Sequence, residues 1–119
     1  MEEAMRLFGT AALGREFYRQ LSESRLEQVR ANAIKAEFLG SGFAPLAAEQ
    51  VRRIHRPALL VNGQRSPGIF HRLVERLKEL LPQSERIEIQ GASHIMHENN
   101  APAYNAAILS FLTRPHPTA

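Results

Sequence analysis

A change from helical to strand spacing near residue 57 limits the fold of this 119-residue chain more than any other feature. Residues 57–63, PALLVNG, form an apolar run between a proline and a glycine, which is typical of a strand buried on both faces. Residues 84–90, SERIEIQ, alternate polar and apolar side chains, which predicts a strand at the edge of a sheet. Between them, Ser66 as N-cap and Pro67 as first helical residue predict the start of an amphipathic helix that ends at Pro82. Its apolar stripe comprises Phe70, Leu73, Val74, Leu77, Leu80 and Leu81.

A strand, a helix and a second strand within about 35 residues have the length of a βαβ unit, whose strands pair in parallel. A last helix is expected from Ala101, ended by Pro115. The expected fold class is therefore α/β, with a βαβα unit over 54–114 and a tail over 115–119. Two parallel strands rarely make a domain, so we expect further strands from a missing segment or a partner.

Residues 1–53 have a helical pattern throughout, and we treat them as one helical segment. A short helix is expected over Thr10–Leu21. Ser22 is the expected N-cap of a second helix, whose apolar stripe stops before Gly40. Residues 46–54 predict one more short helix.

Composition excludes several classes of protein. The hydrophobic fraction of 44% and the charged fraction of 23% are ordinary globular values, and no apolar run approaches the roughly 20 residues that span a bilayer. The N-terminus lacks a signal-peptide pattern, so we expect a cytoplasmic protein without membrane contact. The net charge of +3 is spread among glutamates, which argues against nucleic acid as a partner.

Missing residue types limit the chemistry further. The chain has no cysteine, which excludes thiol nucleophiles and thiolate metal ligands, and no aspartate. It also contains no G-x-S-x-G, G-x-G-x-x-G or phosphate-binding P-loop motif. We therefore expect no cofactor.

The stretch Ile54–Leu112 resembles the final segment of the α/β-hydrolase fold. The resemblance is carried by IHRPALLVNG, the amphipathic helix, LPQSERIEI, GASH and a helix ending AILSFL. Residues 1–53 resemble the end of the helical cap that many members carry before this strand pair. The resemblance implies that His94, in GASHIMH, is the catalytic histidine, which takes a proton from a nucleophile and returns it to the leaving group. The near-neutral pKa of histidine suits both steps.

The third member of the family's triad is an acid, usually an aspartate within a few residues of the glycine that here is Gly63. This chain has Gln64, Arg65, Ser66 and Pro67 there, so the usual acid is absent. Glu37 or Glu98 could replace it, but each is better explained as a surface carboxylate. Ser66 is better explained as a helix cap than as a nucleophile.

Other polar residues support weaker hypotheses. His97 makes a His-x-x-His pair with His94, but zinc needs a third ligand, so we expect no metal site. Asn32 and Lys35 share a helix face that could line a substrate pocket, although a solvated face explains them better. No partner pattern accompanies the three remaining histidines, which we expect at exposed polar positions or in the tail: His55, His71 and His116.

Two hypotheses for function follow. In the first, the chain is the C-terminal part of an α/β-hydrolase that supplies His94 as general base for hydrolysis of an ester-like bond. A small-molecule substrate would then bind only after an N-terminal half had supplied the nucleophile, and the chain alone would be inactive. In the second, it is a non-catalytic module that dimerises or holds a complementing chain through unpaired sheet edges. The sequence leaves open the substrate and whether Met1 is the natural start.

Overall fold

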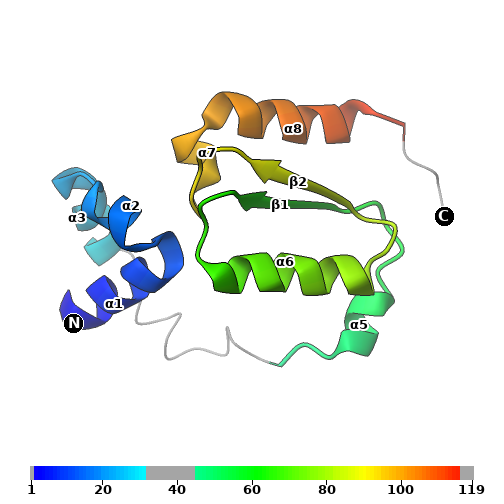
Figure 1. The fold of residues 1–119 in the computed structure, drawn as a ribbon, viewed down its shortest axis with the longest axis horizontal. Coiled ribbons are helices and arrows are strands. Elements are labelled where there is room, and N and C mark those ends of the chain that lie inside the picture. Colours follow the sequence, from blue (N-terminus) through cyan, green and yellow to red (C-terminus); the bar gives the residue numbers. More distant parts are fainter. Residues whose placement is uncertain (1, 32–44, 116–119) are drawn as a thin grey trace. The chain divides into compact units, whose positions relative to one another are not determined.

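The computed structural model describes residues 2–31 and 45–115 of the chain. The chain divides into two compact units, Met1–Leu46 and Ala47–Ala119. The described residues contain seven helices and a two-stranded parallel sheet, which confirms the α/β class and the strand pair (Figure 1). Within 2–31 and 45–115, no helix has the length and apolar character needed to cross a membrane.

The first unit contains three described helices: α1 (Glu2–Leu13), α2 (Arg15–Arg19) and α3 (Glu23–Ala31). Gly14, with φ of 85°, separates α1 from α2. A positive φ is readily adopted only by glycine, so the chain turns here. The prediction of one helix over Thr10–Leu21 is therefore wrong.

Two contacts within this unit hold its helices: a close approach of α2 to α1 and a side-chain cap at the start of α3. The Tyr18 ring packs so closely on α1 that a Cβ at Gly9 would lie 2.3 Å from its Cε2 atom. The predicted cap at the start of α3 is confirmed, because the Arg25 backbone N–H donates to Ser22 Oγ at 3.2 Å. The expected end of this helix before Gly40 lies outside the described residues, as do Asn32, Lys35 and Glu37.

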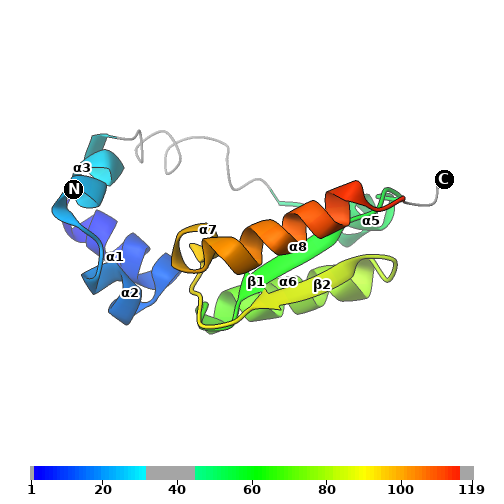
Figure 2. The ribbon, with the colours of Figure 1, turned by 90° about the horizontal axis from the view of Figure 1, so that it is seen from above.

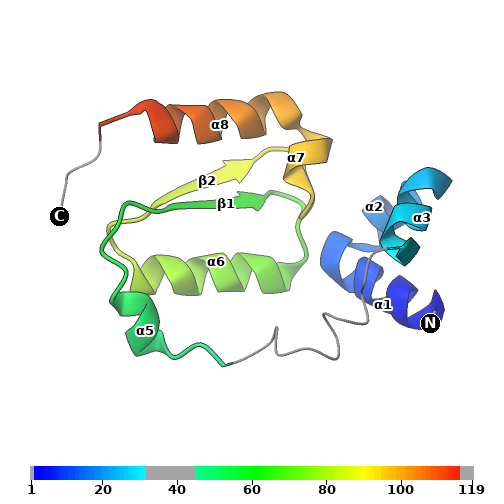
Figure 3. The same ribbon diagram turned by 180° about the vertical axis from the view of Figure 1, so that it is seen from behind.

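The second unit has six described elements: α5 (Ala48–Arg52), β1 (Leu59–Gly63), α6 (Gly68–Leu80), β2 (Glu85–Ile89), α7 (Met96–Asn99) and α8 (Ala101–Thr113). The strands pair in parallel, from Leu59 opposite Glu85 to Gly63 opposite Ile89. Helices α6 and α8 cover opposite faces of the sheet (Figures 1 and 3). Figure 2 looks down on α8, with the two strands between it and α6. This is the βαβα order that the sequence predicts.

The start of α6 differs from the prediction. Pro67 is its N-cap, and no side chain caps the helix, so the prediction that Ser66 caps it is wrong. The Ser66 N–H instead donates to the Gly63 carbonyl at 3.0 Å. Ser66 therefore belongs to the tight turn that leaves β1, one residue too early to serve as the cap.

Two apolar clusters stabilise the second unit. One lies between the sheet and α7 and α8, and contains Ile89, Ala92 and Met96, with Val61, Ile87, Tyr104 and Ala107 around them. The other joins α5 to the C-terminal half of α6, and contains Val51, Leu80 and Leu81, with Ala48 and Leu77. Because these residues bury apolar surface, they supply the main driving force for folding of the unit.

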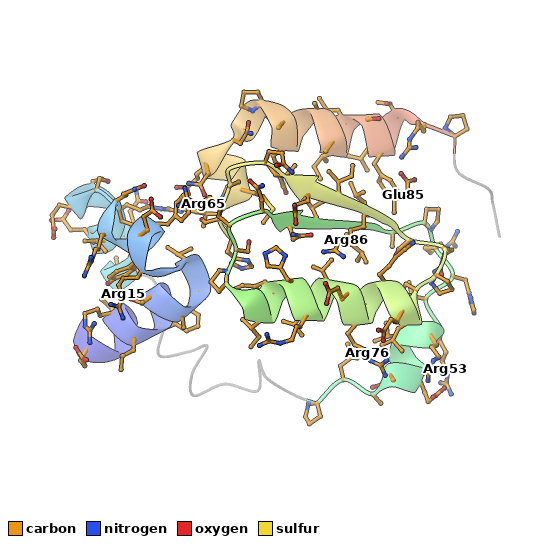
Figure 4. All side chains as sticks on the ribbon, in the orientation of Figure 1. Arg15, Arg53, Arg65, Arg76, Glu85 and Arg86 are labelled. Carbon is orange, nitrogen blue, oxygen red and sulfur yellow. The ribbon has the colours of Figure 1, made fainter. Side chains whose placement is uncertain are left out.

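The face of the sheet that meets α6 carries a cluster of polar side chains. Figure 4 shows Arg86 on this side, whereas Glu85 lies on the side of α8. Asn62, 2% exposed, donates from Nδ2 to Glu88 Oε2 at 3.1 Å, and Arg86 Nε donates to Asn62 Oδ1 at 3.4 Å. In the described part of the chain β2 pairs only with β1, in agreement with the alternation that predicts an edge strand.

Candidate functional site

His94 lies in the loop that follows β2, at the carboxyl end of the sheet. We call residues 90–95 the His94 loop. The loop that follows β1 meets it there, because the Gln64 N–H donates to the Ile89 carbonyl at 2.9 Å and the Arg65 N–H donates to the Ala92 carbonyl at 2.8 Å. Parallel strands bring their carboxyl ends to one edge, where open α/β sheets hold their sites.

Gly63 allows the close approach of these two loops. A Cβ at this position would lie 2.1 Å from the Ser93 carbonyl oxygen and 2.5 Å from that of Ala92. Gly91, with φ of 69°, turns the chain out of β2, and its N–H donates to Gln64 Oε1 at 2.9 Å. The backbone before His94 is therefore held against the end of β1.

A polar clamp holds the same backbone from the other side. Ser93 is fully buried, and both its N–H and its hydroxyl donate to Asn99 Oδ1, at 2.9 and 2.7 Å. Asn100 Nδ2 donates to the Gln90 carbonyl at 3.2 Å, and Asn100 Oδ1 accepts from the Ala103 N–H as the cap of α8. Gln90 and Ser93 of the His94 loop are thus held by Asn100 and Asn99, the two residues that precede α8.

The His94 ring stacks on Phe70, in the first turn of α6. The ring centroids are 3.8 Å apart and the planes differ by 13°. The residue stays exposed as a whole, yet one face of its ring is covered. Partial burial lowers the pKa of His94, and the nearby His97 lowers it further because two positive charges repel. The imidazole is then mainly neutral at pH 7, which is the form that accepts a proton.

His97 and Glu98 follow the His94 loop, in α7. His97 Nε2 is 3.7 Å from Glu98 Oε1, and the His97 ring meets Tyr104 edge-on at 6.1 Å. Among the residues that the structure describes, no group of three or more side chains of the metal-binding types comes together.

Ser66 occupies the loop in which the resemblance implies an acid. It is 7% exposed, and in the described residues its Oγ is buried without a hydrogen-bond partner. A buried hydroxyl without a partner is uncommon, since it loses its hydrogen bonds to water. The alternative acid Glu37 lies outside the described residues, and Glu98 faces His97.

None of the remaining histidines that the structure describes contributes to the His94 loop. His55 is exposed, as predicted, and His116 lies outside the described residues. His71 differs from the prediction because it is partly buried, with Nδ1 3.3 Å from Asn62 Nδ2 and 3.8 Å from Glu88 Oε2. It belongs to the polar cluster between α6 and the sheet.

Sequence reasoning missed Phe70 and Asn99. Phe70 belongs to the apolar stripe of its helix, and nothing local indicates that its ring turns to a loop after β2. The asparagine directly before Ala-Pro is typical of a helix start, which points to Asn100 as the cap of α8 and only indirectly to its neighbour Asn99. Its bonds to Ser93, however, depend on the three-dimensional course of the loop.

Comparison with models of known protein families, with curated proteins and with solved structures found no match to this chain. The His94 loop and its contacts with Phe70, Asn99 and Gln64 are the features that bear on function.

Proposed function

We propose that the chain is the C-terminal part of an α/β-hydrolase and supplies His94 as the general base for hydrolysis of an ester-like bond. The observation that carries this proposal is the place of His94: a loop after the second of two parallel strands, fastened on both sides, with one ring face against Phe70. In open α/β sheets the site lies at the carboxyl ends of the strands, so a general base for this reaction is expected at that edge.

The chemistry follows from the protonation state of the ring. A neutral imidazole accepts the proton of a serine hydroxyl as that oxygen attacks the substrate carbonyl, and the resulting imidazolium gives the proton to the leaving group. The lowered pKa of His94 favours the neutral form before the first step. It also makes the imidazolium a stronger acid in the second step.

The proposal includes inactivity of the chain alone. The sequence contains no G-x-S-x-G, and Ser66 stands in the loop where the acid would stabilise the imidazolium. A hydroxyl carries no charge and cannot replace a carboxylate in that role. Both the nucleophile and the acid would come from another segment.

The test is complementation. The coding sequence immediately upstream should contain an in-frame G-x-S-x-G, and that segment, expressed with this chain, should hydrolyse p-nitrophenyl butyrate. His94→Ala should lower kcat by a factor of about a thousand or more, as loss of a triad histidine does, whereas the matched control His71→Ala should retain activity. An upstream sequence without the motif, or full activity of His94→Ala in a stable complex, would contradict the proposal.

A second candidate function is a non-catalytic module that dimerises through its sheet. The observation that favours it is the strand count: in the described part of the chain β1 and β2 pair only with each other, so each has an outer edge with unpaired backbone groups. Sedimentation equilibrium of the purified chain distinguishes the two. A concentration-independent monomer would contradict dimerisation and leave the hydrolase proposal intact.

A further inference from the structure

We propose that Phe70 is a positioning residue for His94, which sets the plane of the imidazole and leaves both ring nitrogens open for proton transfer. This inference rests on the proposed function and names a residue that acts through the base. It stands on the ring stacking, with centroids 3.8 Å apart and planes 13° from parallel.

The two rings are anchored on different elements. Phe70 lies in the first turn of α6, and its N–H donates to the carbonyl of the N-cap residue Pro67 at 2.9 Å, so its backbone is held in that turn. His94 follows Ser93, which Asn99 holds through two hydrogen bonds. Since neither backbone is free to follow the other, the stacking restricts rotation of the His94 side chain.

The geometry of the contact leaves the reactive atoms accessible. Stacking covers a face of the imidazole, whereas Nδ1 and Nε2 lie on its edge. The exposed state of the residue agrees with an open edge. A base must be held within about 0.5 Å and 10–20° of the productive geometry, and a stacked aromatic ring fixes orientation better than an aliphatic contact does.

The same contact excludes water from one side of the ring. Burial is the larger of the two causes that lower the pKa of His94, and His97 is the smaller. A Phe–imidazolium pair also has a cation–π attraction, which opposes this effect by favouring the charged form. The two causes that lower the pKa of His94 are burial, to which the Phe70 contact contributes, and the charge of His97.

The experiment is proton NMR of the purified 119-residue chain, with three variants. In the wild type, Phe70 ring protons should give nuclear Overhauser effects to the His94 Hε1 or Hδ2 proton, and the ring current of Phe70 should shift the His94 signals upfield. Phe70→Leu should abolish the upfield shift and raise the pKa of His94 toward its ordinary value, because a leucine covers less of the ring. Phe70→Tyr should retain both properties, since it keeps the aromatic plane.

Leu73→Ala is the matched control, because Leu73 lies on the same helix and is 53% exposed. It should change neither the shift nor the pKa. Phe70→Leu signals identical to those of the wild type would overturn the proposal, as would absence of the wild-type Overhauser effect, which needs no variant. Failure of His94→Ala to affect the complemented esterase would contradict the proposed function alone, because the NMR contact is measured without catalysis.

Discussion

The two faces of the β1–β2 sheet are held by different forces. Toward α8, Val61, Ile87 and Ile89 point into an apolar cluster that also buries Ala92 and Met96. Toward α6, Asn62, Arg86 and Glu88 form a hydrogen-bonded polar cluster with His71. Burial of apolar surface scales with area and has no preferred direction, whereas hydrogen bonds depend on geometry. Of the two faces of the sheet, the α8 face is therefore expected to contribute more to stability, in addition to the separate apolar cluster between α5 and α6.

His94 is the place where the two faces meet. Its loop belongs to the α8 side, because Ala92 within the loop and Met96 directly after it are part of the apolar cluster. Its ring belongs to the α6 side, because it stacks on Phe70. The two faces therefore differ in role. Substitutions in the apolar cluster on the α8 face should destabilise the unit, whereas substitution of Phe70 on the α6 side should move the His94 ring or its pKa while the unit stays folded.

The largest effect should come from Ile89→Ala. Ile89 is 2% exposed at the centre of the α8-side cluster, and its truncation should cost about 2–5 kcal/mol of unfolding free energy through lost burial and a residual cavity. Urea denaturation followed by circular dichroism measures this cost. Ile69→Ala is the control, because Ile69 on α6 is 54% exposed and should change stability by less than about 0.5 kcal/mol. Equal losses of unfolding free energy in the two variants would contradict the larger contribution of the α8 face.

The second largest effect should come from Gly63→Ala, which should lower the unfolding free energy by about 1–3 kcal/mol through overpacking. The added Cβ would lie 2.1 Å from a backbone oxygen of Ser93, which cannot rotate away as a side-chain end can. The His94 loop must then shift, so the His94 NMR signals should move as well. Gly68→Ala is the matched control, because its Cβ would meet only the end of the Arg72 side chain at 3.5 Å, and alanine favours a helix. A stable Gly63→Ala variant with unchanged His94 signals would refute the close fit of the two loops.

The order of elements in the second unit could be predicted because the spacing of apolar residues and the positions of glycine and proline indicate the same segments there. The apolar run before Gly63 and the alternation in 85–89 correspond to β1 and β2 within two residues at each end. The stripe of α6 predicted a helix correctly, but it did not predict burial, since Leu73 is 53% exposed. A helix beside a two-stranded sheet covers only part of its apolar stripe.

The details of the site depended on contacts between segments far apart in sequence, which no local pattern contains. Glycine is tolerated inside helices, so the break at Gly14 was not visible. Ser66 has the residue type of a cap, yet the turn after β1 places it one position too early. The Phe70 stacking and the Asn99 clamp require the course of the loop itself.

Asn62→Ala tests the polar face. Asn62 bonds to groups that can also reach water, since Arg86 and Glu88 are exposed. Its loss should therefore cost only about 1 kcal/mol, the net value of a typical hydrogen bond. Asn105→Ala, at an exposed position of α8, serves as control and should be neutral. A loss as large as that of Ile89→Ala would show that the polar face carries as much stability as the apolar one.

The smallest effect should come from His97→Gln, which removes an ionisable ring near His94 at an exposed position of α7. His97 is the second cause of the lowered pKa of His94, so the substitution should raise that pKa by less than Phe70→Leu does. The lowered pKa of His94 also makes the stability of the folded chain depend on pH. Because the pKa of His94 is lower in the folded chain than its ordinary value of 6.5, the unfolded chain binds more protons, and stability falls as pH drops through this range.

The contribution of His94 is fully present above pH 6.5 and is lost as pH falls through the folded pKa. In His97→Gln the two pKa values lie closer together, so the acid-dependent loss should be smaller. NMR titration of the His94 Hε1 proton measures the pKa, and His55→Gln, at an exposed position, should leave it unchanged. If His97→Gln lowered the pKa of His94 instead, charge repulsion could not be the cause, and the neutral form of the proposed base would be maintained by burial against Phe70 alone.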